Sequence, residues 1–340
     1  MSPEEWRREA QALRARGRHA EALDAFDAAR AAAEADGDPV LAARVRIGAI
    51  DSLAMCGRHD EALALAETLE RTLADAGAAG DAARARANAG GVHLRRDRYA
   101  EALDAYTDAA RRFADAGDAP ALATTRVNAA VALTHLGRID QAAELYDLAR
   151  AAFADAGREF EAAVVDADRG HLLETAGLLL PALRALGDAE AAFARLDRPH
   201  EQARCAVDLA HVQRALNLLP EALASAERAR NVFETLPLEY DRGRAERERA
   251  AALLALGRDH DAEAALEDAR RIFDDQGNDA QSALTLLARA HLHHARGRRD
   301  DARRDAREAA TRLADTGLDG ARDEADLVVS DLDQDIPRLA

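Results

Sequence analysis

Polar side chains suited to binding a ligand recur in this sequence at intervals of 40 residues. Asn88 and Asn128 form one such pair, and Arg84 precedes Asn88 by four residues. A side-chain amide donates to a peptide carbonyl and accepts from a peptide N–H at the same time, and a guanidinium adds a contact to a carboxylate. These residue types are suited to hydrogen bonding with the main chain of a peptide. The alternative, that both asparagines are solvated helix residues, stays open at this point.

Charged residues follow the same interval further along the chain. Arg204 and Asp208 are four residues apart, and so are Arg244 and Glu248. That spacing places the two members of each pair on one face of a helix. For both pairs it favours a local ion pair over a ligand contact.

Histidines also share a column, at His171, His211 and His291. Helices of neighbouring repeats lie ~10 Å apart, so we expect polar groove residues here and no metal site. Protonation of these histidines between about pH 5 and 7 would tune such a groove. The residues that we assign to a ligand-binding surface are Arg84, Asn88, Asn128, Asp168, His171, Arg204, Asp208, His211 and Arg244.

The composition excludes several kinds of catalysis. All 46 basic residues are arginine, which rules out a phosphate-binding loop with its lysine, a pyridoxal Schiff base and a lysine nucleophile. Cys56 and Cys205 are too few for a disulfide framework or a four-ligand zinc site. No Gly-x-Ser-x-Gly, His-Glu-x-x-His or Cys-x-x-Cys motif occurs. We therefore expect no enzyme, no cofactor and no bound metal.

The charge balance bears on the partners. The formal net charge is −17, from 63 acidic and 46 basic residues. Nucleic-acid binding needs a concentrated basic face, and aromatic residues, at 4%, are too few for a base-stacking surface. No apolar run approaches the ~20 residues of a membrane span, and the first residues lack the pattern of a secretory signal. We expect neither nucleic acid nor membrane as a partner, and a cytoplasmic location.

A 40-residue repeat without insertion or deletion organises the chain. One column contains only residue types that tolerate the left-handed backbone of a tight turn after a helix. Its members are Gly17, Gly57, Asp97, Gly137, Gly177, Asn217, Gly257 and Gly297. Five residues further on, alanine occupies every unit, at Ala22, Ala62, Ala102, Ala142, Ala182, Ala222, Ala262 and Ala302. A second turn column divides each unit into two segments of roughly 16 residues.

Both segments predict α-helix. Alanine, leucine, arginine and glutamate dominate, and apolar residues recur at three- and four-residue steps, as at Leu103, Tyr106 and Phe113. Alanine at a helix crossing lets two axes approach towards ~8 Å, while larger residues fill the space where helices diverge. One pair of helices buries too little surface to fold alone, so the pairs must stack into an array.

The second segments resemble the second helix of the tetratricopeptide repeat, in which an alanine is followed by an aromatic residue four positions on and by another alanine three further. That pattern stands at Ala22, Phe26 and Ala29, and again at Ala102, Tyr106 and Ala109. The words Gly-Arg-His-Ala-Glu-Ala-Leu at 17–23 and Gly-Arg-His-Asp-Glu-Ala-Leu at 57–63 are similar to the family's inter-helix turn. A 40-residue period is also typical of HEAT and armadillo repeats, but the alanine–aromatic spacing favours the tetratricopeptide family.

The resemblance implies an all-α fold, a right-handed α-solenoid of eight helix-turn-helix repeats over residues 1–320. A capping helix and tail would follow over 321–340, limited by Pro337. Ile50 departs from the small residue that the family carries in its first helix. In this family the first helices line the concave face, and related proteins that hold extended peptides use asparagine there. The resemblance implies that role for Asn88 and Asn128.

For function, the resemblance implies a non-enzymatic scaffold that binds a protein or peptide segment in the concave groove. A second hypothesis is a sensor or adaptor subunit of a bacterial signalling or defence system, which regulates a separate effector such as a CHAT-type protease or a transcription regulator. Self-association through the array ends is a further expectation, because the terminal faces of an array are sticky unless they are capped.

Overall fold

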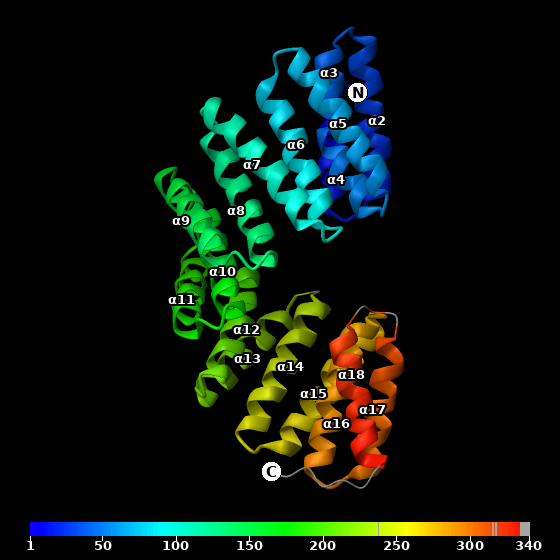
Figure 1. Cartoon of the computed structure of the whole chain (residues 1–340), viewed down its shortest axis with the longest axis vertical. Coiled ribbons are helices and arrows are strands. Elements are labelled where there is room, and N and C mark those ends of the chain that lie inside the picture. Colours follow the sequence, from blue (N-terminus) through cyan, green and yellow to red (C-terminus); the bar gives the residue numbers. More distant parts are fainter. Residues whose placement is uncertain (237, 315, 317, 334–340) are drawn as a thin grey trace. The chain divides into compact units, whose positions relative to one another are not determined.

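The computed structural model describes residues 1–333 except 237, 315 and 317, and this part of the chain consists of α-helices and the turns between them (Figure 1). The predicted class, an all-α solenoid, is confirmed. The chain divides into two compact units, unit 1 at Met1–Val165 and unit 2 at Asp166–Ala340, and each is described by itself. The helices are α1 (Pro3–Ala15), α2 (His19–Ala35), α3 (Pro39–Val45), α4 (Ile47–Met55), α5 (His59–Asp75), α6 (Ala79–Leu94), α7 (Tyr99–Asp115), α8 (Ala119–His135), α9 (Ile139–Asp155), α10 (Glu159–Thr175), α11 (Leu179–Arg195), α12 (Pro199–Ala215), α13 (Leu219–Phe233), α14 (Glu239–Ala255), α15 (Asp259–Asp275), α16 (Asp279–Ala295), α17 (Arg299–Leu313) and α18 (Asp319–Asp333).

The turns between the helices have the left-handed residue that the column predicts. Gly17 has a φ of 72° and donates its N–H to the Arg14 carbonyl at 2.9 Å, while the N–H of Arg18 donates to the Leu13 carbonyl at 3.0 Å. This pair of bonds satisfies carbonyls that the end of α1 would otherwise leave unpaired. Asp97 takes the same conformation without being glycine, with a φ of 56°.

The core is built from the alanine column. Every alanine of that column has no exposed surface, from Ala22 on α2 to Ala302 on α17. Each lies at the start of a second helix, where that helix packs against its neighbours. Because the side chain ends at Cβ, the helices approach closely at these points.

Large and small residues are matched between facing helices. A Cβ at Gly90 would lie 2.8 Å from Cε1 of Tyr106, so the ring packs there only against glycine. Ile50 shares a buried cluster with Ala66, which stands where other repeats carry Phe26 or Tyr106. In the second repeat the large side chain is therefore on the first helix and the small one is on the second helix. This reversal explains the departure of Ile50 from the family pattern.

The first helix of the second repeat is broken, whereas the sequence predicts one segment. α3 and α4 meet at Arg46, whose N–H donates to the Ala43 carbonyl at 3.2 Å and whose carbonyl accepts from Ala49 at 2.9 Å. Both bonds span three residues instead of four, which tightens the chain locally. Gly48, two residues on, weakens the helix because glycine costs about 1 kcal/mol relative to alanine in a helix interior.

At the C-terminal end of the described chain, α18 packs against α17 and α16. Ala325, Val328 and Leu332 are buried in a cluster with residues of those two helices. The predicted helix stop at Pro337 lies outside the described residues. The division into eight repeats and a cap stays a prediction.

Candidate functional site

Unit 1 contains a groove of about 740 Å³, lined from its first helices by Arg84, Asn88 and Asn128 among others. Its volume lies in the range of ligand-binding pockets in general. The remaining walls include Arg14 on α1, Arg44 on α3, Gly48 on α4 and Thr125 on α8. The 40-residue spacing therefore brings both asparagines and the arginine to one cavity.

The two asparagines of the groove have unused hydrogen-bonding capacity. Nδ2 of Asn88 donates to the Ile47 carbonyl at 3.0 Å, next to the break between α3 and α4. Its Oδ1 accepts no hydrogen bond within the described residues, and the amide of Asn128 makes none there. Both side chains are half-buried. An amide has two donors and a two-site acceptor, so the pair can bind main-chain groups of a guest segment.

Arg84 lies at the rim of the groove in a ladder of ion pairs. Its guanidinium contacts Asp81 and Asp118, each at 2.9 Å, and Arg44 donates to the other oxygen of Asp81 at 2.6 Å. The ladder links α3, α6 and the turn before α8. A ligand carboxylate that reaches Arg84 must compete with Asp118, so this arginine is less available than its sequence position indicates.

A glycine opens the groove beside α4, which sequence reasoning missed. Gly48 occupies the same column as Asn88 and Asn128. A Cβ at Gly48 would lie 2.6 Å from Cζ of Phe26 and 3.1 Å from Nη1 of Arg14. The glycine thus leaves room for both side chains to line the groove. The signal was present, since Gly48 interrupts a column of polar residues.

The corresponding face of unit 2 carries ion pairs between helices. Arg244 on α14 donates to Asp208 on α12 at 3.0 Å, and Nε of Arg204 lies 3.9 Å from Asp241 on α14. The predicted local pairs of Arg204 with Asp208 and of Arg244 with Glu248 are wrong. Each arginine instead spans the gap to the neighbouring helix, where a carboxylate also lies within reach of its long side chain.

His211 bridges carboxylates from the helices on both sides of α12. Its Nε2 lies 3.3 Å from Glu174 on α10, and its Nδ1 lies 3.4 Å from Glu248 on α14. The hydrogen bond with Glu248 raises the pKa of His211, against the effects of burial and of Arg214. The exposed His171 pairs with Glu174 at 3.2 Å. Within the described residues, no group of three potential ligands could hold a metal ion.

Asp168 is the remaining predicted site residue of unit 2. Burial raises its pKa to about 6, although His171 and Arg204 partly offset that effect. Burial also raises the pKa of Asp208, in spite of its bond with Arg244. The cost of ionising these carboxyl groups is a property of the packed face.

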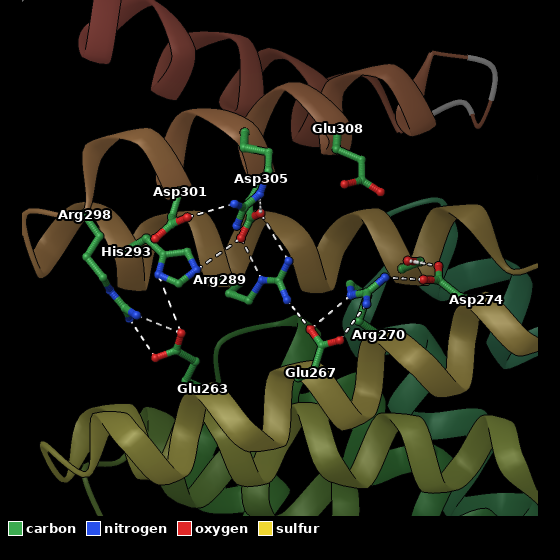
Figure 2. Close-up of polar contacts among 12 residues, drawn as sticks. Glu263, Glu267, Arg270, Asp274, Arg289, His293, Arg298, Asp301, Asp305 and Glu308 are labelled. Carbon is green, nitrogen blue, oxygen red and sulfur yellow. Dashed lines mark hydrogen bonds and ion pairs between the residues drawn. The ribbon is translucent and has the colours of Figure 1, made fainter.

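A polar network around the buried carboxyl group of Asp305, which joins α15, α16 and α17, was not predicted (Figure 2). Asp305, whose side chain is fully buried, accepts from Arg289 at 2.7 and 3.1 Å and lies 3.3 Å from Nε2 of His293. Arg289 also bonds Glu267, and Arg298 bonds Glu263 at 2.7 and 2.8 Å. The sequence contained a signal, because Asp305 falls in a column otherwise made of alanine, leucine and serine.

Cys205 is not placed for nucleophilic chemistry. Burial raises the pKa of Cys205 to about 12, so its thiol stays protonated at neutral pH. Cys56 is exposed in a turn. Among the described helices, none is both long and apolar enough to cross a membrane.

Solved structures define the class of the fold. The chain superposes on the apo form of RapI with a TM-score of 0.69 and 12% identity, over 98% of both chains. A Rap protein complexed with competence and sporulation factor gives 0.61 and 12%, again over 98% of both chains. A signal transduction ATPase (STAND) with a tetratricopeptide repeat sensor, from Pyrococcus horikoshii, gives 0.66 and 11% over 92% of this chain and 49% of that one.

These structures confirm the tetratricopeptide-repeat fold that the sequence pattern predicts. No protein-family model and no curated protein matches the sequence. The fold class is therefore shown by structure, and the function must be argued from the site.

Proposed function

We propose that this protein is a non-enzymatic scaffold that binds a peptide or protein segment in the groove of unit 1. The observation that carries the proposal is the pair Asn88 and Asn128, which line one cavity with unused donors and acceptors. Side-chain amides on neighbouring helices hold an extended main chain without regard to its sequence, since every residue offers an N–H and a carbonyl. The Rap protein whose structure contains competence and sporulation factor supports a ligand of this kind.

The electrostatics of the groove limit what enters it. Arg7, Arg14, Arg44 and Arg84 line it against a single carboxylate, that of Asp81. Asp81 pairs with Arg44 and Arg84, whereas Asp51, which lies 3.2 Å from Arg14, is not part of the lining. A segment with acidic or neutral side chains fits this lining better than a basic one.

The test uses peptides selected from a displayed random library on the full chain, with affinities measured by calorimetry. Each amide-to-peptide hydrogen bond contributes about 0.5–1.5 kcal/mol, so Asn88→Ala/Asn128→Ala should raise the Kd by about 5- to 150-fold. Asn231→Ala, on an exposed face of α13, is the matched control and should leave the Kd unchanged. Selected peptides that bind the folded double variant as tightly as the wild type would refute the proposal.

A second candidate function is that of a sensor or adaptor for an effector on another chain. The similarity to the STAND protein with a tetratricopeptide repeat sensor favours it. The two functions are separable by co-purification from the native lysate. A complex with a protease or transcription regulator that survives Asn88→Ala/Asn128→Ala would favour the adaptor, whereas loss of the partner would assign it to the groove.

A further inference from the structure

Four arginines line the groove of unit 1, and Arg14 differs from the other three in its contacts. Arg7 donates to a carboxylate on its own helix at 2.7 Å, while Arg44 and Arg84 donate to the two oxygens of Asp81. Arg14 makes no side-chain hydrogen bond with the part of the chain that the structure describes, and its Nε is buried without a partner. A buried donor that the fold leaves unsatisfied calls for an explanation. In the wall of a cavity, that explanation is a ligand.

Positive charge is also in excess at Arg14. Its guanidinium contacts one carboxylate within the described residues, that of Asp51, which lies 3.2 Å from Nη2 and also bonds Arg95 at 2.8 Å. Two guanidinium groups thus share a single carboxylate, whereas the ladder at the rim has two carboxylates for its two arginines. The side chain of Arg14 is 34% exposed, so a ligand in the groove can reach it.

Arg14 and Asn88 contact consecutive residues of α4. Nδ2 of Asn88 donates to the Ile47 carbonyl at 3.0 Å. A Cβ on the next residue, Gly48, would lie 3.1 Å from Nη1 of Arg14. The amide and the guanidinium are therefore neighbours in one cavity. A guest segment whose main chain binds Asn88 has a side chain within reach of Arg14.

We propose that Arg14 selects guest segments that carry an aspartate or glutamate side chain beside the main-chain contact with Asn88. A carboxylate accepts two parallel hydrogen bonds from the fork of a guanidinium. The ring of Phe26, which lies beside Gly48 in the lining, offers an apolar contact to the methylene groups of such a side chain. The inference rests on the proposed function of the groove, to which it adds the class of guest side chain.

A double-mutant cycle on the full chain tests the inference. Peptides selected from a displayed random library are synthesised with both ends blocked, so that side chains carry their only carboxylates. Each acidic residue is replaced in turn by its neutral amide, and calorimetry gives the Kd of both forms for the wild type and for Arg14→Gln. At one position, the acidic form should bind the wild type about 10- to 150-fold more tightly than the amide form. Arg14→Gln should bind the two forms equally.

Arg7→Gln is the matched control. Arg7 lies on the same helix and lines the same cavity, but a carboxylate of the chain already accepts from it. This variant should keep the preference of the wild type for the acidic form. Arg14→Gln should fold normally, since Arg14 makes no hydrogen bond within the described chain, and circular dichroism will check this.

The outcomes separate this inference from the proposed function. Selected peptides without acidic residues, or an acidic preference that persists in Arg14→Gln, would overturn the inference alone, provided that Asn88→Ala/Asn128→Ala still weakens binding. Loss of binding when the peptide's C-terminus is blocked would also overturn it, because the carboxylate would then belong to the chain end. Selected peptides that bind the folded asparagine double variant as tightly as the wild type would refute both proposals.

Discussion

The same column of the repeat has different roles in the two units. In unit 1 it holds Asn88 and Asn128, whose amides retain free donors and acceptors in a groove. In unit 2 it holds Asp168, Asp208 and Glu248, and the last two are engaged by Arg244 and His211. A neutral amide is cheap to leave half-satisfied in a half-buried position, whereas a carboxylate that packing removes partly from water needs a partner. The first arrangement leaves capacity for a ligand, and the second uses it within the protein.

The largest effect should come from breaking the polar interior of unit 2. Arg289→Ala leaves the buried Asp305 without its bidentate partner (Figure 2), so the free energy of unfolding should fall by about 3–5 kcal/mol. Urea titration of the full chain measures it. Arg271→Ala removes an exposed pair with Asp268 and should leave the transition midpoint in place. A similar loss of unfolding free energy in both variants would show that the pair of Arg289 with Asp305 stabilises the protein no more than an exposed ion pair does.

Asp168→Asn places an asparagine in unit 2 at the repeat position that Asn88 and Asn128 occupy in unit 1. The folded state raises the pKa of Asp168 to about 6, so the folded protein binds this proton more tightly than the unfolded chain does. Stability is therefore lost as pH rises from about 4 to about 6. The variant should be about 1–3 kcal/mol more stable at pH 7. The difference should vanish below about pH 4; a pH-independent difference in urea titrations would contradict this reasoning.

Gly48→Ala tests the local cause of the groove in unit 1. The new Cβ would lie 2.6 Å from the ring of the buried Phe26, and overpacking of this kind costs about 1–3 kcal/mol. Gly80→Ala, also in a helix of unit 1, meets no atom within 4 Å. That control should be neutral or more stable by up to about 1 kcal/mol. Equal stability of the two variants in urea would show that Gly48 is not needed for space.

The smallest expected effect on stability distinguishes the roles of the two asparagines. Asn88→Ala loses the bond to the Ile47 carbonyl and should cost about 0.5–1.5 kcal/mol. Asn128→Ala loses no bond within the described chain and should stay within about 0.5 kcal/mol of the wild type. Thermal unfolding measures both. A larger loss from Asn128→Ala would assign Asn128 a structural role and remove it from the groove's binding capacity.

Much of this architecture was predictable because the repeat has a strict period. The left-handed turns, the buried alanine column and the meeting of Asn88 with Asn128 in one groove all follow from residues that recur every 40 positions. The break at Arg46 did not follow, because glycines also lie inside the unbroken helices α6 and α10, so Gly48 alone does not predict a break.

The ion pairs of unit 2 show a different limit. Arg244 has a carboxylate four residues away on its own helix and another on the neighbouring helix. The spacing in the sequence does not show which carboxylate pairs with Arg244, because the choice depends on side-chain geometry in the folded protein. Asp305 likewise stands out in its column, yet its partner Arg289 becomes apparent only when α16 and α17 are packed together.

The central claim is that the groove of unit 1, and not the equivalent face of unit 2, binds the ligand. Hydrogen–deuterium exchange of the full chain, with and without a peptide selected on it, tests that claim most directly. The account predicts slower exchange in α3, α4, α6 and α8, with α12 and α14 unchanged, and loss of the protection in Asn88→Ala/Asn128→Ala. Protection confined to α12 and α14, or protection that persists in the folded double variant, would contradict it.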